Sequence, residues 1–204
     1  ENPGVSVVII GLTRESVKRI FLKDILNKIN KDFNLNAKTN LSDLTLTLPN
    51  KSVIYLLGLD SNPDDMDKLL GQKNKLALID EAGFFKQDLY KLVYEVLAPS
   101  MIDHDGTIAL ISTTSHLVNT FYYRVTTGQV NGWSVHKWTA SQNPFIKEKW
   151  QQEMDKLMSD TPGIEETPMF RRMYLNQWVI DQDNLVYKHN IHNLIETLSD
   201  EHYR

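Results

Sequence analysis

The chain has 204 residues, which is enough to bury one substantial core, and its formal net charge at pH 7 is −4. It contains no cysteine, which excludes disulfide bridges and thiolate metal sites. No segment approaches the ~20 consecutive apolar residues of a membrane-spanning helix, no secretory signal is visible, and a mildly acidic chain is not expected to bind nucleic acid over its whole surface.

Apolar runs that suit strands buried on both faces occur at residues 5–10, 76–79 and 107–111. Each run precedes a segment with helical spacing of its apolar residues. The first such segment covers residues 15–33, the second has Pro99 just past its expected end, and the third has Gly128 as its expected stop. Alternating strands and helices predict an α/β fold with a mostly parallel sheet that is flanked by helices.

A β-hairpin is predicted between the first two of these units, because alternating apolar residues at 44–48 and the run at 53–57 flank a Pro-Asn-Lys-Ser turn. Residues 132–138 are expected to form a further strand. From Pro144 onward the spacing predicts a helical subregion, with helices at about 144–159 and 166–177. We expect one domain over residues 1–180 and a linker over residues 181–204.

Two adjacent carboxylates, Asp80 and Glu81, directly follow the second apolar run. Open α/β sheets bind their ligands at the carboxyl ends of the strands. In a nucleoside-triphosphate hydrolase, this arrangement lets the first carboxylate hold Mg²⁺, often through water, and lets the second orient the attacking water. The alternative interpretation is a buried strand that ends in an ordinary polar turn.

A run of hydroxyl side chains follows the third apolar run and includes Ser112, Thr113 and Thr114. Beside a carboxylate pair, such hydroxyls can sense the γ-phosphate or its water and shift the chain behind them. The alternative is that they cap the following helix.

No glycine-rich loop ending in Lys and Ser or Thr occurs, although P-loop enzymes use such a loop to bind phosphates. The nucleotide-binding residues are therefore unknown. We expect either a chain that begins downstream of the first βα phosphate-loop unit or a protein that has lost this unit.

The order of these segments resembles the ATPase domain of tailed-bacteriophage terminase large subunits, which are DNA-packaging motors. The resemblance rests on six segments and covers most of residues 5–188. Residues 76–82 resemble the Walker B strand of that family and residues 112–114 its coupling motif. The others are residues 8–14, residues 52–60 together with 67–71, residues 139–144 and residues 170–175. Met173 stands where the family often has Glu, and the nuclease domain expected after the ATPase domain is absent from this sequence.

The resemblance implies a P-loop NTPase-like fold and an ATP hydrolase that drives double-stranded DNA into a procapsid. Glu81 would be the catalytic glutamate, Asp80 the magnesium-side carboxylate, and Ser112, Thr113 and Thr114 the coupling residues. The implied cofactors are ATP and Mg²⁺. The implied partners are double-stranded DNA, a portal protein, a small terminase subunit and further copies in a ring, in the host cytoplasm and transiently at the portal vertex.

We expect the 204 residues alone to be inactive, since they lack the phosphate loop. Two other functions are compatible with the sequence. One is a helicase-like or other nucleic-acid-dependent ATPase, and the other is a catalytically inactive scaffold or interaction module.

Overall fold

The computed structural model describes residues 3–59, 69, 71 and 73–179 of the chain. Its centre is a six-stranded sheet in the order β2-β3-β4-β1-β5-β6. The strands are β1 (Ser6–Gly11), β2 (Lys38–Asn40), β3 (Thr45–Thr47), β4 (Val53–Gly58), β5 (Asn74–Asp80) and β6 (Thr107–Ile111). The four strands from β4 to β6 are mutually parallel, whereas β2 and β3 pair antiparallel. The predicted α/β sheet is therefore confirmed.

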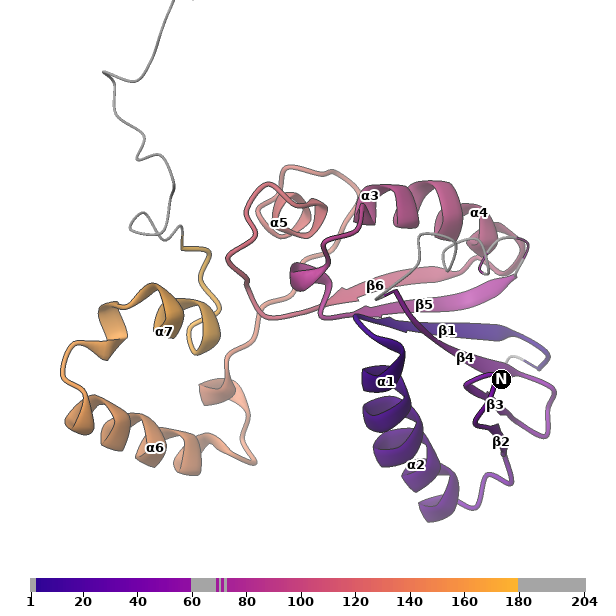
Figure 1. Ribbon diagram of the computed structural model, residues 1–204, viewed down its shortest axis with the longest axis horizontal. Helices are drawn as coiled ribbons and strands as arrows, with labels where there is room; N and C mark the ends of the chain where they lie inside the picture. Colours follow the sequence, from indigo (N-terminus) through magenta and orange to yellow (C-terminus); the bar gives the residue numbers. More distant parts are fainter. Residues whose placement is uncertain (1–2, 60–68, 70, 72, 180–204) are drawn as a thin grey trace, which may run out of the picture.

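Helices cover both faces of the sheet (Figure 1). One face carries a single continuous helix formed by α1 (Arg14–Ser16), the π-helical segment Val17–Leu26 and α2 (Asn27–Asp32). The other face carries a helix formed by α3 (Leu89–Lys91), the π-helical segment Leu92–Leu97 and α4 (Ala98–Met101), together with α5 (Phe121–Thr126). Two separate apolar clusters, one on each face, form the core.

The sequence predicts that the helix after β5 ends before Pro99. In the structure this helix continues through Pro99 to Met101. A proline has a φ angle compatible with a helix, and it interrupts the backbone hydrogen bonding only where its missing N–H would donate. The prediction for α5 is confirmed at its end, because Gly128 has a φ of +78° and its N–H donates to the Val125 carbonyl at 3.1 Å.

The predicted hairpin is present as β3 and β4, and β4 also pairs with β1. Strand β2, which pairs with β3 and has three exposed polar residues, was not predicted. The prediction of a strand at residues 132–138 is wrong. The apolar residues Trp133 and Val135 alternate with the polar residues Ser134 and His136, as in a strand. No described strand pairs with this segment, however, and strand pairing supplies much of the stability of a strand.

The helical subregion lies beyond the sheet, and it contains α6 (Lys147–Asp160) and α7 (Pro168–Met173) (Figure 1). The first predicted helix is confirmed, and the second is shorter than expected because residues 164–166 form a 3-10 turn and Thr167 caps α7. The expected linker at residues 181–204 lies outside the described residues. No helix within the described part of the chain is long and apolar enough to cross a membrane.

Candidate active site at the carboxyl ends of β5 and β6

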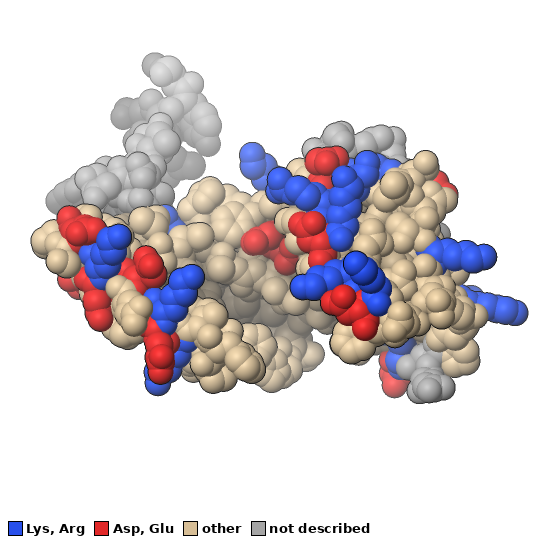
Figure 2. Space-filling view, turned by 90° about the horizontal axis from the view of Figure 1, so that it is seen from below, with Lys and Arg blue, Asp and Glu red and all other residues tan. Residues whose placement is uncertain are grey.

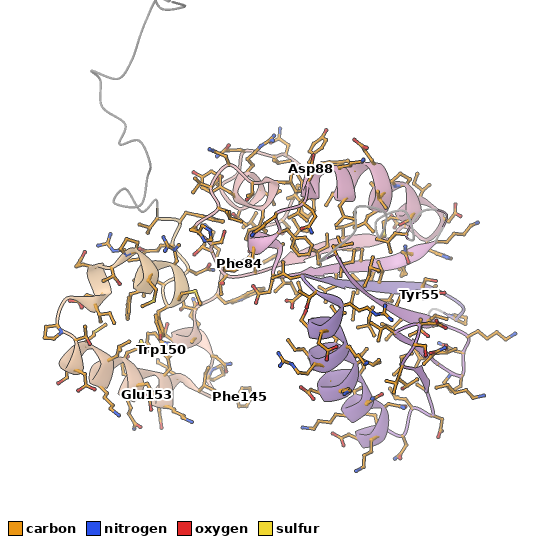
Figure 3. The ribbon with its side chains drawn as sticks, viewed as in Figure 1. Tyr55, Phe84, Asp88, Phe145, Trp150 and Glu153 are labelled. Atoms are coloured by element: carbon orange, nitrogen blue, oxygen red, sulfur yellow. The ribbon has the colours of Figure 1, made fainter. Side chains whose placement is uncertain are left out.

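The acidic pair lies at the carboxyl end of β5, a strand that is flanked by β1 and β6 on either side. Asp80 is the last residue of β5 and stands opposite Ile111 of β6. Glu81 follows with a left-handed backbone, at φ +56° and ψ +35°. This conformation ends the strand abruptly, and a 3-10 turn at Ala82–Phe84 begins at once. The turn carries Phe84, which Figure 3 shows close to these strand ends.

Burial raises the pKa of both carboxyl groups above their ordinary values. For Asp80 the cause is desolvation, which the Glu81 N–H partly offsets. For Glu81 desolvation is again the largest cause, the charge of Asp80 adds to it, and the hydroxyl of Ser112 acts in the opposite direction. No described cation forms a salt bridge with either carboxylate, so the pair carries negative charge that a bound cation could neutralise.

Ser112 joins the acidic pair from the neighbouring strand. Its hydroxyl donates a hydrogen bond of 3.4 Å to Oε2 of Glu81. The Ser112 carbonyl in turn accepts a 2.9 Å hydrogen bond from the hydroxyl of Tyr122 on α5. Burial raises the pKa of Tyr122, and the nearby charge of Glu81 raises it further. Tyr122 therefore belongs to the same site.

Close backbone packing between the two strand ends makes this geometry possible. A Cβ atom at Gly83 would lie 2.9 Å from the Thr113 carbonyl oxygen and 3.0 Å from the Ser112 hydroxyl. The buried hydroxyl of Ser115 donates to the Gly83 carbonyl at 2.5 Å. Only glycine lets the turn after Glu81 approach the hydroxyl segment this closely.

Thr114 faces the helical subregion rather than the carboxylates. Its buried hydroxyl lies 3.1 Å from the carbonyl oxygens of Arg172 and Gln177, at and after the end of α7. Thr113 contributes its backbone carbonyl to the contact with Gly83. Of the five site residues predicted from sequence, the structure thus brings Asp80, Glu81 and Ser112 together and places Thr114 at a second contact.

The alternative interpretation, in which these hydroxyls cap the following helix, does not agree with the structure. Thr120 caps α5 by accepting from the Tyr123 N–H at 3.2 Å, whereas Ser115 accepts from the Leu117 N–H within a local turn. Tyr122 was not predicted as a site residue. Its only sequence signal was its place in the helical spacing after residue 117, which indicates burial rather than a role at the strand ends.

A pocket of about 470 Å³ lies beside the hydroxyl segment. Its walls come from the end of β6, from α5, from residues 136–140 and from the helical subregion, and they include the aromatic side chains of Trp138, Trp150, Tyr174 and Trp178. The indole N–H of Trp178 donates to the Thr126 hydroxyl at 3.0 Å and so fixes one wall to α5.

The donor set fits magnesium better than a softer metal. Mg²⁺ is usually held by one or two carboxylates, with waters and substrate phosphates as its other ligands. Asp80 and Glu81 supply such carboxylates, and burial raises the pKa of Asp80 with no described cation to offset it. The described residues contain no cluster of three or more His, Cys, Asp or Glu side chains that could hold a metal ion by itself.

No protein-family model matches the chain, and no curated protein matches it. Several solved structures match it in fold. The ATPase domain of the Thermus phage P74-26 large terminase aligns over 87% of this chain and 78% of its own length, with a TM-score of 0.57 and 17% identity. The large terminase of another thermophilic bacteriophage and that of HK97 also align over 87% of this chain, with TM-scores of 0.59 and 0.57 and 18% identity each.

The chain has the fold of a phage large terminase ATPase domain. It spans 42% of the second thermophilic phage terminase and 40% of the HK97 terminase. That thermophilic phage terminase has also been solved in complex with ADP, in a structure with a TM-score of 0.58 and 18% identity. The segment at Thr139, which resembles the family's loop before Asn-Pro, forms a capping box in which the Thr139 N–H is bound by Gln142 at 2.9 Å. The arginines of the last resembling segment lie on α7.

Proposed function

We propose that this chain is the ATPase part of a viral DNA-packaging motor, a terminase large subunit that couples ATP hydrolysis to translocation of double-stranded DNA into a procapsid. The observation that carries the proposal is the hydrogen bond between Ser112 and Glu81 at the carboxyl end of a parallel sheet. The likeness of the fold to phage large terminases, one of them solved with ADP, supports it.

In this proposal Glu81 orients and polarises the attacking water, and Asp80 holds Mg²⁺ through a water. The metal would neutralise charge on the phosphates during transfer. Asp80 is the last residue of β5, and Glu81 follows it in the left-handed turn, so both carboxylates lie at the same strand end. Raised carboxyl pKa values are typical of functional sites.

Ser112, Thr113 and Thr114 couple the site to the helical subregion. Ser112 contacts Glu81, and two residues later the Thr114 hydroxyl contacts the carbonyls of Arg172 and Gln177. A displacement of the end of β6 would therefore act on both the water-positioning carboxylate and the segment after α7. Such a connection is what a motor needs to convert the state of its nucleotide into movement.

The proposed partners are double-stranded DNA, a portal protein, a small terminase subunit and further copies in a ring, in the host cytoplasm and at the portal vertex. Charged side chains of both signs intermix on the face drawn in Figure 2, with uncharged surface between the two ends of the molecule. DNA contacts on this face would therefore be local rather than spread over a continuous basic surface.

The test is ATP hydrolysis by a polypeptide in which this chain is joined to a phosphate loop. Glu81→Gln keeps the size of the side chain but removes its charge, and it should lower turnover by several orders of magnitude. Glu95→Gln, on the exposed side of the helix after β5, is the matched control and should leave turnover unchanged. Near-normal turnover in the Glu81→Gln variant would remove Glu81 from this role. We expect the 204 residues alone to bind an ATP analogue weakly or not at all.

A further inference from the structure

A short turn after α5 contains the pair Asn131–Gly132, which is the only Asn-Gly pair in the sequence. Both residues are exposed, and Gly132 has a left-handed backbone with a φ of +86°. An asparagine that precedes glycine is chemically reactive, because the glycine has no side chain to shield its own backbone nitrogen from the asparagine carboxamide. The turn is therefore a place where the backbone itself could change covalently.

The two groups that would react are both free. Neither the carboxamide of Asn131 nor the N–H of Gly132 makes a hydrogen bond with another described residue. A Cβ atom at Gly132 would meet no other atom within 4 Å, so no neighbouring group crowds the turn. Within the described part of the chain, nothing has to give way before the Gly132 nitrogen approaches the carboxamide carbon.

Other asparagines lie in surroundings that oppose the same reaction. For four of them the N–H of the next residue already donates to an oxygen atom at 2.9–3.0 Å, namely for Asn34, Asn36, Asn50 and Asn176. Asn143 precedes a proline, which has no N–H. Asn119 is exposed, but it precedes Thr120, whose branched side chain shields the nitrogen.

We propose that Asn131 is a site of spontaneous deamidation, which converts the turn to aspartate and isoaspartate without an enzyme. The Gly132 nitrogen loses its proton to hydroxide and attacks Cγ of Asn131. A bond forms between this nitrogen and Cγ, the bond from Cγ to Nδ2 breaks, and the amide nitrogen leaves as ammonia. The product is a five-membered succinimide ring.

Water then opens the ring at one of its two carbonyl carbons. Attack at Cγ restores the ordinary backbone with an aspartate, whereas attack at the backbone carbonyl carbon leaves the chain connected through Cγ, as isoaspartate. One water is consumed and one ammonia is released, and no atom is oxidised or reduced. Each product carries a carboxylate where Asn131 had a neutral amide.

The turn is held at both of its ends. Val130 and Trp133 pack against the apolar cluster on the face of the sheet that α3, α4 and α5 cover. The indole N–H of Trp133 donates to the Tyr94 hydroxyl at 3.3 Å, and the ring meets that of Phe121 edge-on at a centroid distance of 5.8 Å. Isoaspartate lengthens the backbone by one methylene group, so it has to displace one of these anchors.

Such a displacement would also reach the pocket of about 470 Å³. The segment that begins at Trp133 continues into residues 136–140, which form part of the wall of this pocket. Deamidation would thus alter the pocket wall from a turn that does not line it. The reaction depends on the turn alone and goes beyond the proposed ATPase function.

The test follows the whole chain at pH 8 and 37 °C by mass spectrometry of its proteolytic peptides. The peptide with Asn131 should gain about one dalton, because an NH2 group is replaced by OH, and part of it should contain isoaspartate in a methyl-transfer assay specific for that residue. The rate should rise about tenfold per pH unit, since hydroxide removes the proton. The peptide with Asn119 is the internal control and should change at least tenfold more slowly; equal rates at the two positions overturn the proposal.

Asn131→Gln keeps an exposed amide but would need a less favourable six-membered ring, so it should slow the change at least tenfold. Gly132→Ala should slow it as well, although the φ of +86° strains an alanine, so the glutamine variant decides. A synthetic peptide of residues 127–136 gives the rate without the fold. A rate in the folded chain that is at least tenfold below the peptide rate would show that the fold keeps the two groups apart, and it would overturn the proposal.

The effect on the fold is tested with the isoaspartate form, separated by ion exchange. It should melt about 2–4 °C below the unmodified chain, and the indole N–H of Trp133 should exchange at least tenfold faster. Asn131→Asp supplies the carboxylate without the added methylene group and should leave both values unchanged. An isoaspartate form that matches the unmodified chain in both measurements would overturn the displacement of the anchors. None of these results depends on ATP hydrolysis.

Discussion

The hydroxyl of Ser112 donates a 3.4 Å hydrogen bond to the carboxylate of Glu81, across the ends of two neighbouring parallel strands. Glu81 lies in the turn after β5, and Ser112 is the first residue after β6. The two residues are 31 positions apart in the chain and are brought together by strand pairing. Any change in the relative position of these strand ends therefore changes the surroundings of the carboxylate.

Ser112→Ala should lower ATP turnover by about ten- to a hundredfold in a polypeptide that carries the phosphate loop, because a mispositioned catalytic group costs about this much. Its effect on the free energy of unfolding should be small, since the hydrogen bond is exposed and long. Steady-state hydrolysis and urea unfolding measure the two effects. Ser134→Ala, a comparable loss of an exposed hydroxyl, is the control, and equal effects of the two substitutions would contradict the prediction.

Thr114→Val should lower the free energy of unfolding by about 1–3 kcal/mol, because it leaves two carbonyl groups near a buried position without their donor. The substitution preserves shape, so the loss reports on the hydrogen bonds. Urea unfolding followed by tryptophan fluorescence measures it. Thr127→Val, an exposed hydroxyl that bonds within its own helix end, should change the free energy by less than about 0.5 kcal/mol.

Gly83→Ala should destabilise the fold by about 1–3 kcal/mol, because the added methyl group would lie 2.9 Å from a backbone carbonyl that cannot move freely. The damage should also reach Ser112, whose hydroxyl would lie 3.0 Å from the new Cβ atom. Thermal unfolding measures the first effect. The control is Gly163→Ala, which meets no atom within 4 Å and tests backbone strain alone at a φ of +84°. A Gly83→Ala variant that loses no more stability than Gly163→Ala would contradict the close approach of Gly83 to the Thr113 carbonyl.

Glu81→Gln should raise the free energy of unfolding at pH 7 and have little effect near pH 4. The pKa of the Glu81 carboxyl is raised by burial and by Asp80, so the folded state favours the protonated form. The stabilising contribution of such a group is complete below its ordinary value of 4.5 and is lost as the pH rises through the raised pKa.

The gain should stay below about 1 kcal/mol, because Glu81 is partly exposed and solvent screens its charge. Thermal unfolding of wild type and variant between pH 4 and pH 8 measures the difference between them. Glu95→Gln should give a difference that does not vary with pH. A wild type that is more stable than the Glu81→Gln variant at pH 7 would reverse the sign and contradict the prediction.

The sequence predicted the central strands well, because residues 5–10, 76–79 and 107–111 are mostly apolar runs of strand length, a pattern that suits strands in the interior of a parallel sheet. It also predicted that Glu81 would lie near the hydroxyl segment, since the carboxyl ends of parallel strands lie at one edge of a sheet, and within that segment the Ser112 hydroxyl contacts Glu81. That part of the site follows from topology and needs no knowledge of side-chain contacts.

The features that the sequence could not predict depend on contacts between distant segments. Residues 132–138 alternate like a strand but find no partner strand, and pairing is not visible in a local pattern. Tyr122 has the spacing of a core residue, and its hydroxyl reaches Ser112 because α5 packs over the end of β6. The different orientation of Thr114 likewise depends on where the segment after α7 comes to rest.

The backbone conformation at position 81 is unfavourable for glutamate. A left-handed backbone costs a residue other than glycine about 1–3 kcal/mol, and glycine or asparagine would adopt it more cheaply. Replacing Glu81 by glycine would relieve this backbone strain, and it would also remove the carboxylate that the proposed hydrolysis needs. In this proposal the turn after β5 gives up stability in order to hold an acid at the end of the strand.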